Sequence, residues 1–535
     1  MFDLQKIFNS ILYLCFAVAT GSMLILSVLA GRKTAIICAL FIAATVFFVK
    51  KLNTTSEGFI SKKERYTHLF KVFMIIAILL GFTVKLVYSS LIEDSAIADA
   101  LLCFNAAQQA ANGDFSWISL DYFQRWAYQI PFVLYETAVL KIFGNYKALY
   151  IMGAVFSILT CMLFYAVSKK MVKNENAALA VTALFTWMPN ALFQIDTMYN
   201  QLIGGLFLML SIYFFSFIFT ESFDEKINPK QLLFCLLTGI FSGISNLFRA
   251  EAIVEILAVA CYLIFVTVTQ SDKKTLLKYI IKSVVFFAVF FIGYKVVTGG
   301  TDWIITASGI HPYGIKNRCP YWFIVCGLTP ESYGAYSEKY IGIVYTLDSE
   351  AQKKMFSDIM HEIFADRSFF DILIFFAKKL SIMWGTPEEP HCMISDSALW
   401  HRISYVMVLA NHYIYMLFSI LAIVGIKMKK FRNSSSFLTI YFMGYFCIYL
   451  IKEIAPRYRY STLFILALLS VYGIQAVFDY KNGRLPCNCK IKNKLKNHLK
   501  GKSQIDRSRR TIATQIINQT NKKQTILHNR KRKFF

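Results

Sequence analysis

The chain has 535 residues, of which 56% are apolar and only 17% are charged, whereas a soluble domain carries about 25% charged residues. Its mean hydropathy is +0.48, and its 49 Phe and 30 Tyr side chains are more than a water-soluble core could bury. The composition therefore excludes a soluble enzyme, a disordered hub and a disulfide scaffold. It predicts a protein whose solvent is lipid.

The net charge of +25 is concentrated at the C-terminal end of the chain. Residues 479–535 contain 17 Lys and Arg but only 2 acidic residues, a surplus of +15. Such a tail can bind nucleic acid, but basic segments beside membrane spans are typical of cytoplasmic loops and are attracted by anionic lipid headgroups. We therefore predict a basic cytoplasmic tail at the membrane surface and no nucleic-acid partner.

A helix needs about 20 mostly apolar residues to cross the hydrocarbon core of a bilayer. Twelve stretches of the sequence approach this length and composition, and they predict an all-α, polytopic membrane protein with about 12 transmembrane helices. The expected spans are 10–30, 34–49, 72–92, 147–167, 177–195, 202–220, 231–248, 252–270, 278–298, 404–426, 436–452 and 461–478.

Lys and Arg in short loops indicate which side of the membrane is cytoplasmic. Basic clusters recur on one side, and they place both termini in the cytoplasm; the clusters lie at 50–71, 169–173, 273–278 and 427–432. The same assignment leaves two sizeable extracytoplasmic loops. The expected division is two N-terminal spans with a cytoplasmic loop (1–71), a transmembrane core with the first outside loop (72–298, loop 93–145), an outside helical cap (299–403), C-terminal spans (404–478) and the basic tail (479–535).

The outside cap contains an apolar stretch from Phe369 to Trp384 that two lysines interrupt. We predict a helix lying in the membrane interface here, because a thirteenth span would move the basic tail to the wrong side. The cap would help to select an acceptor, or it would be a packing lid without substrate contact.

The first outside loop begins with two acids, Glu93 and Asp94, just past the end of a predicted span, and Asp99 follows five residues after Asp94. Asp99 opens an amphipathic helix that Gly113 closes, so it complements the helix dipole. Loop acids commonly only face water. Further along, Tyr122 lies in a segment that combines aromatic rings with Asp, Arg and Gln side chains, a composition that suits an amphiphilic substrate.

Two short polar segments lie between later spans. Asp196, Tyr199 and Asn200 form a cluster that is commonly a turn. Arg249 and Glu251 stand two residues apart, a spacing that does not face one side of a helix. We therefore expect the last two side chains to point at different partners across a cavity.

The last outside turn contains Glu453, Arg457, Tyr458 and Arg459. A charge so close to the hydrocarbon is costly without a partner, so it is a functional candidate. Arginine grips phosphate through two parallel hydrogen bonds. Outer acids together with arginines predict an anionic, lipid-linked substrate.

These segments resemble the C-type glycosyltransferase superfamily, and most of all the bacterial relatives of the protein mannosyltransferases and aminoarabinose transferases (glycosyltransferase family 39-like). The resemblance covers about residues 72–478. It is carried by Asp99-Ala100, Ala106, Gly113-Asp114-Phe115, Tyr122-Phe123, Phe143-Gly144, the run Leu247 to Ala252, and Glu453 with Pro456 to Tyr460.

The resemblance implies a cell-envelope enzyme that takes a sugar from a polyprenyl-phosphate donor and transfers it, outside the cytoplasm, to a glycan, lipid or protein acceptor. It implies an essential acid in the first outside loop, which is Asp99, with Asp94 as the second choice. Many relatives carry an acid directly after the tyrosine of the third outer loop, where this chain has Asn200. Asp196 would then supply a second carboxylate. No cofactor is firmly implied, although a divalent metal is possible.

The expected mechanism uses Asp99 as the general base on the acceptor hydroxyl. Single direct displacement with one base would invert the anomeric carbon, whereas retention needs a second carboxylate nearby. The donor phosphate would be held by Arg249, Arg457 and Arg459, and the remaining substrate contacts would come from Tyr122, Asp196, Tyr199, Asn200, Glu251, Glu453 and Tyr458.

A lipid-linked oligosaccharide flippase or another multi-span transporter is the alternative function, and a polysaccharide polymerase is a variant of glycosyl transfer. A transporter would place charges near the bilayer midplane and would show related halves. Here the charges gather at the outer ends of spans. Lys85 is the exception, and we expect it to extend its ammonium group outward along the helix.

Overall fold

The computed structural model describes residues 4–29, 63–92, 96, 98–172, 174–220, 226–270, 275–386, 398–429 and 433–481. The chain divides into two units, 1–478 and 479–535, and the first carries everything discussed below. Within the described residues the secondary structure is helical, apart from one isolated antiparallel bridge between Trp126 and Asn317. The expected all-α class is confirmed.

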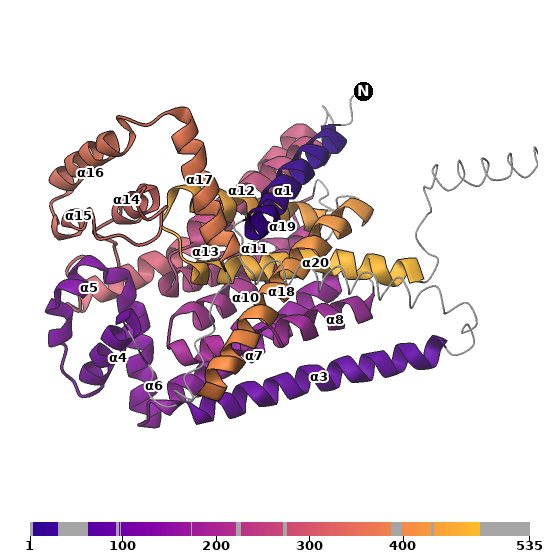
Figure 1. The fold of residues 1–535 in the computed structure, drawn as a ribbon, viewed down its shortest axis with the longest axis horizontal. Helices are drawn as coiled ribbons and strands as arrows, with labels where there is room; N and C mark the ends of the chain where they lie inside the picture. Colours follow the sequence, from indigo (N-terminus) through magenta and orange to yellow (C-terminus); the bar gives the residue numbers. More distant parts are fainter. Residues whose placement is uncertain are drawn as a thin grey trace, which may run out of the picture. The chain divides into compact units, whose positions relative to one another are not determined.

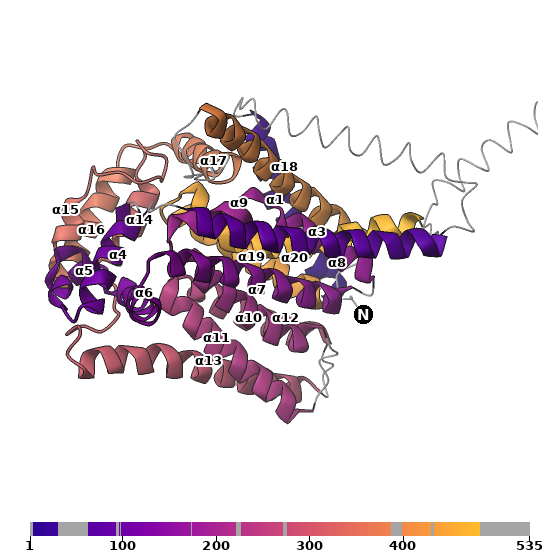
Figure 2. The ribbon, with the colours of Figure 1, turned by 90° about the horizontal axis from the view of Figure 1, so that it is seen from below.

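The described helices follow one another closely along the chain (Figures 1 and 2). In chain order they are α1 (Leu4–Leu29), α3 (Lys63–Leu91), α4 (Ala98–Ala111), η2 (Ser116–Ser119), α5 (Asp121–Arg125), η3 (Ala127–Gln129), α6 (Ile130–Phe143), α7 (Lys147–Met171), α8 (Glu175–Thr186), α9 (Pro189–Phe193), η4 (Gln194–Thr197), α10 (Gln201–Phe219), α11 (Pro229–Phe248), α12 (Ala252–Gln270), α13 (Leu276–Ala307), α14 (Trp322–Leu328), α15 (Gly342–Tyr345), α16 (Ser349–Phe364), α17 (Phe369–Gly385), α18 (Ala398–Lys429), α19 (Asn433–Ile451), η5 (Pro456–Arg459) and α20 (Tyr460–Lys481).

Among the described residues, nine helices are long and apolar enough to cross a membrane, so this is a multi-pass membrane protein. Their apolar parts are Ile7–Ile25, His68–Leu91, Lys147–Met171, Gln201–Phe219, Pro229–Phe248, Ala252–Thr269, Leu276–Ala307, Tyr405–Met428 and Pro456–Asp479. Of the twelve expected spans, 34–49 lies outside the described residues. The apolar helix Ser435–Ile451 is shorter than these nine.

The expected continuous span at 177–195 is wrong. Helix α8 ends at Thr186, and a new short helix starts at Pro189 after Met188 has taken an extended backbone. The residue before a proline is pushed out of the helical region, and proline itself suits a first helical position. A two-helix segment therefore replaces the expected single rod.

Helices α10 to α13 lie side by side at one edge of the bundle (Figure 2). Three glycines let α11 and α13 approach each other closely. A Cβ on Gly239 would clash with the carbonyl oxygen of Phe290, one on Gly293 would lie 2.5 Å from the Leu236 carbonyl oxygen, and one on Gly243 would lie 3.0 Å from the Tyr294 carbonyl oxygen. Small residues at helix contacts are typical of membrane bundles, because burial of apolar surface drives little association in lipid.

The two expected outside segments lie together at one end of the bundle (Figure 2). Besides the bridge from Trp126 to Asn317, the Arg318 amide donates to the Arg125 carbonyl at 3.2 Å, and the rings of Trp126 and Phe323 are 5.6 Å apart. The second segment starts later than expected, because α13 continues to Ala307. The first loop and the cap thus form one layer.

A helix at the apolar stretch of the cap is present as α17. It packs against α1 and buries Lys379, Met383 and Trp384, while Phe369 and Phe370 are exposed. Its place in the membrane interface stays a prediction.

Lys85 does not extend outward as expected. Its side chain is fully buried, and its Nζ donates to the Ser157 hydroxyl at 2.9 Å and to the Ala191 carbonyl. The Ala191 carbonyl belongs to the short helix α9. The last four carbonyls of a helix have no hydrogen-bond partner within it, so this carbonyl can accept from Lys85. The Lys85 ammonium group is therefore hydrogen-bonded inside the bundle instead of to water at the membrane surface.

Candidate active site

The segment between α11 and α12 is extended rather than helical. Arg249 closes α11 with φ −141° and ψ 108°, and α12 begins at Ala252. Side chains two residues apart lie on the same side of an extended chain. Accordingly, Nε of Arg249 lies 2.6 Å from Oε1 of Glu251, with both side chains largely buried. The expectation that they point at different partners is wrong, because helical spacing does not apply here.

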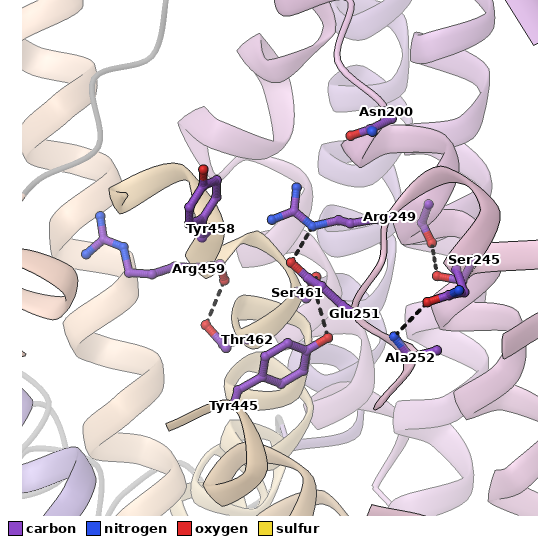
Figure 3. A network of polar contacts seen from close by, with 12 residues as sticks. Asn200, Ser245, Arg249, Glu251, Ala252, Tyr445, Tyr458, Arg459, Ser461 and Thr462 are labelled. Atoms are coloured by element: carbon purple, nitrogen blue, oxygen red, sulfur yellow. Dashed lines mark hydrogen bonds and ion pairs between the residues drawn. The ribbon is translucent and has the colours of Figure 1, made fainter. Parts of the chain in front are cut away.

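Glu251 is surrounded by groups of the protein itself (Figure 3). Its carboxylate accepts hydrogen bonds from the hydroxyls of Ser461 at 2.7 Å, Tyr445 at 3.2 Å and Tyr449 at 3.4 Å. Burial would raise the pKa of Glu251, but the positive charge of Arg249, assisted by other neighbours, outweighs it and lowers that pKa. Glu251 is thus a charged anchor for Arg249, which leaves it little capacity for a substrate.

Tyr458 lies between two arginines. The guanidinium carbon of Arg249 is 5.7 Å from its ring centroid, and that of Arg457 is 5.6 Å away. Arg457 also lies 5.4 Å from the Tyr199 ring, and its side chain is exposed. Two cations held by aromatic faces at one end of the bundle are suited to a phosphate group.

Arg459 points away from this pair (Figure 3). It is buried, and it donates to the carbonyls of Trp384 at 3.1 Å, Thr386 at 2.8 Å and Pro456 at 3.0 Å. The structure therefore places Arg459 as a link between η5 and the end of α17, whereas Arg249 and Arg457 come together around Tyr458.

Glu453 is buried beside the same tyrosine. The Tyr458 hydroxyl donates to Oε1 of Glu453 at 3.4 Å, and the backbone amide of Glu453 donates to the Phe323 carbonyl of the cap at 2.7 Å. Burial raises the pKa of the Glu453 carboxyl, the positive charges of Lys452 and Arg457 oppose this, and the negative charge of Asp99 adds to it. Cap and bundle meet at this residue.

Asp99 is exposed in the first turn of α4. The preceding Ala98 has φ +48°, a left-handed conformation that is strained for a residue other than glycine. Burial raises the pKa of Tyr199, and the Asp99 carboxylate raises it further while Arg457 lowers it. The charge of Asp99 thus acts on the pKa values of both Tyr199 and Glu453.

The other expected carboxylates fall beyond what the structure describes: Asp94 lies outside the described residues, and the side chain of Asp196 in η4 is not described either. Across the described part of the chain, no group of three or more His, Cys, Asp or Glu side chains is placed to hold a metal ion. No metal-dependent step is therefore derived for this site.

Gln129 connects two of the expected substrate residues. Its amide nitrogen donates to the Tyr122 hydroxyl at 3.3 Å, and its amide oxygen accepts from the Asn200 side chain at 3.3 Å. Sequence reasoning missed this residue, although it lies in the polar aromatic segment around Tyr122. It also missed Tyr445 and Tyr449, whose four-residue spacing on α19 was the available signal.

One end of this all-helical membrane bundle gathers two arginines and aromatic rings, an arrangement that suits an anionic group on a substrate. Residues 131–294 match the family described as dolichyl-phosphate-mannose-protein mannosyltransferase. This match confirms, over these residues, the resemblance to the protein mannosyltransferases that is expected from the sequence. The matched region includes Arg249 and Glu251 and ends before the cap.

Two solved structures are similar to this chain at low identity. The apo oligosaccharyltransferase of Archaeoglobus fulgidus is 12% identical, with a TM-score of 0.42 over 80% of this chain and 51% of the other. The oligosaccharyltransferase AglB of Archaeoglobus fulgidus, in complex with an inhibitory peptide and a dolichol-phosphate, is 13% identical, with a TM-score of 0.43 over 78% and 51%. The chain thus spans about half the length of these proteins. No curated protein matches it by sequence.

Proposed function

We propose that the protein transfers a sugar from a polyprenyl-phosphate donor to an acceptor hydroxyl at the extracytoplasmic face of the membrane. The observation that carries this proposal is the grouping of Arg249 and Arg457 around Tyr458, with Asp99 in the same cluster. The basic loops of the sequence support the assignment of this end to the outside.

In the proposed reaction, Asp99 removes the proton of the acceptor hydroxyl while that oxygen attacks the anomeric carbon of the sugar. The bond from this carbon to the phosphate oxygen breaks, and its electron pair stays on the polyprenyl phosphate. Arg249 and Arg457 stabilise the charge that develops on this leaving group, which is usually a large contribution to catalysis. One base and one displacement invert the anomeric carbon.

The exposure of Arg457 and Asp99 supports a site that is open to water-borne or membrane-bound acceptors. The burial of Arg249 supports a fixed place for the donor phosphate, because its guanidinium is already held by Glu251. Tyr199, Asn200 and Tyr122 border the same region through their contacts with Arg457 and Gln129. We assign these three to the sugar and the acceptor.

Release of polyprenyl phosphate by the purified protein in lipid nanodiscs tests the proposal. A set of polyprenyl-phosphate sugars is supplied with a set of hydroxyl acceptors, and wild type is compared with Asp99→Asn. We expect release by the wild type and strongly reduced release by the variant. Movement of lipid-linked glycan across liposomes, without release of polyprenyl phosphate, would contradict the proposal and favour the flippase.

A further inference from the structure

The cap contains a cleft of about 500 Å³ between α16, α17 and the loop that follows α14. Its walls include Tyr333, Asp366, Arg367, Phe375 and Lys378. A cleft of this size lies within the range of small-molecule binding sites, about 300–1,000 Å³. It is separate from the cluster around Tyr458, none of whose residues lines it.

The side chain of Tyr333, in the wall of the cleft, is held in a fixed conformation. Tyr333 has φ +49°, in the left-handed region that residues other than glycine seldom adopt. The Nζ of Lys378 donates to the Tyr333 hydroxyl at 2.8 Å and lies 4.6 Å from the ring centroid. The strained tyrosine is therefore held in place against the cleft.

Polar groups in the cleft are available to a ligand. Asp366 makes no hydrogen bond or ion pair with any described residue, and Arg367 uses its Nε for the Ile363 carbonyl at 2.8 Å. The two terminal nitrogens of the guanidinium thus keep their donors. Carboxylate and guanidinium groups each bind pairs of neighbouring hydroxyls, and the half-buried ring of Tyr333 can cover the apolar face of a sugar ring.

We propose that this cleft binds a short, neutral glycan as the acceptor, or as the part of the acceptor next to the reacting hydroxyl. The role of this glycan as an acceptor rests on the proposed function, whereas the binding of the glycan to the cleft does not. Two common modes of peptide binding use a free strand edge or an apolar groove, and the described part of the cap, which is helix and loop, offers neither at this polar cleft.

Helix α17 connects the cleft with the active-site turn. Lys378 faces Tyr333, whereas the next residue, Lys379, is fully buried and donates to the carbonyls of Leu450 at 3.0 Å, Lys452 at 2.9 Å and Gly327. The Gly334 carbonyl also accepts from the Ile454 amide at 2.8 Å. A glycan in the cleft is therefore held by the same elements that position Glu453.

The test uses the full chain in nanodiscs, without any donor, and three trisaccharide probes: mannotriose, maltotriose and N-acetylchitotriose. Saturation-transfer NMR and titration calorimetry measure their binding to wild type, Asp366→Asn, Tyr333→Gly and the control Asp358→Asn, an exposed acid on α16 outside the cleft. Glycine accepts the positive φ of residue 333, so that variant removes the ring without adding strain.

We expect at least one probe to bind wild type and the control equally, with affinity at least ten-fold weaker in both cleft variants. Absence of binding by all three probes, or equal binding by all four proteins, would overturn the proposal. A serine- and threonine-containing peptide that binds with the same dependence on Asp366 would overturn the glycan class. Because binding is measured without a donor and only cleft residues are changed, a failure of the cleft is distinguished from a failure of Asp99 as the catalytic base.

Discussion

Arg249 and Glu251 form a buried ion pair, with 2.6 Å between Nε and Oε1, on an extended three-residue link between two membrane helices. The pair fixes the guanidinium of Arg249 on the side of Tyr458, 5.7 Å from its ring centroid. Glu251 in turn is fixed by hydroxyls from α19 and α20. The position of Arg249 therefore depends on α19, η5 and α20, whose contacting residues lie about 200 positions further along the chain.

Glu251→Gln should destabilise the protein strongly. The amide keeps the size of the side chain but leaves the buried Arg249 without a counter-charge, a change that costs about 3–5 kcal/mol when one partner of a buried pair is lost. Thermal unfolding in detergent measures the effect. The control is Glu331→Gln, which breaks the exposed pair with Lys339 and should cost about 1 kcal/mol or less. Equal, small effects of both changes would contradict the anchoring role.

Asp99→Asn should reduce sugar transfer by about 10²- to 10⁴-fold, the usual contribution of a general base. The thermal stability should stay unchanged, because the side chain is exposed. Asp114→Asn is the matched control: this exposed acid only accepts a hydrogen bond from the Ser116 amide at 2.8 Å. Transfer by Asp99→Asn at the wild-type rate would remove Asp99 from the mechanism.

The positions of the site segments in the chain could be predicted, because polar residues at span ends are conspicuous in an apolar sequence. Asp99, Tyr199, Arg249 and Arg457 all come from such ends, and the structure brings the last three together near Tyr458. The same segments carry the resemblance to the protein mannosyltransferases, which the family match over residues 131–294 confirms. The hydrogen-bond and ion-pair partners of the individual site side chains could not be predicted from the sequence.

Three errors have one physical origin, which is backbone that is not regular helix. The extended link pairs Arg249 with Glu251, the break before Pro189 divides an expected span, and the short helix after it gives Lys85 a carbonyl partner. Apolar periodicity predicts helices and spans, but it does not predict where a membrane helix is interrupted. The polar contacts of Arg249 and Lys85 are formed at such interruptions.

Arg457→Ala and Arg459→Ala should have different effects although both remove a guanidinium from η5. Arg457 is exposed and should be needed for the donor, so its loss should reduce transfer by about 10²-fold with normal stability. Arg459 is buried on three backbone carbonyls, so its loss should lower stability by about 2–5 kcal/mol. Transfer and thermal unfolding are measured for both variants. A selective loss of transfer in Arg459→Ala, with intact stability, would reverse the assignment.

The raised pKa of Glu453 predicts how stability depends on pH. The folded protein holds the Glu453 proton more tightly than the unfolded chain, whose carboxyl has its ordinary pKa of 4.5. The folded state is therefore favoured at low pH, and this contribution is lost as the pH rises from about 4.5 through the folded-state pKa. The difference in melting temperature between wild type and Glu453→Gln, measured from pH 4 to 8, isolates this group. Wild type should lose stability relative to the variant as the pH rises, and a constant or opposite difference would contradict the burial of a protonated carboxyl.

Neighbouring lysines on α17 provide the last prediction. Lys379→Met removes the ammonium group that binds the carbonyls of Leu450 and Lys452 beside Glu453. A displacement of about 1 Å in this turn should lower kcat by up to about 10²-fold, while the KM for the acceptor changes little. Lys378→Met instead frees Tyr333 at the cleft, so it should raise the KM for a glycan acceptor and leave kcat near the wild-type value. Steady-state transfer by both variants separates the two parameters. If Lys379→Met changed only KM, or if both variants behaved alike, α17 would not position the active-site turn independently of the cleft.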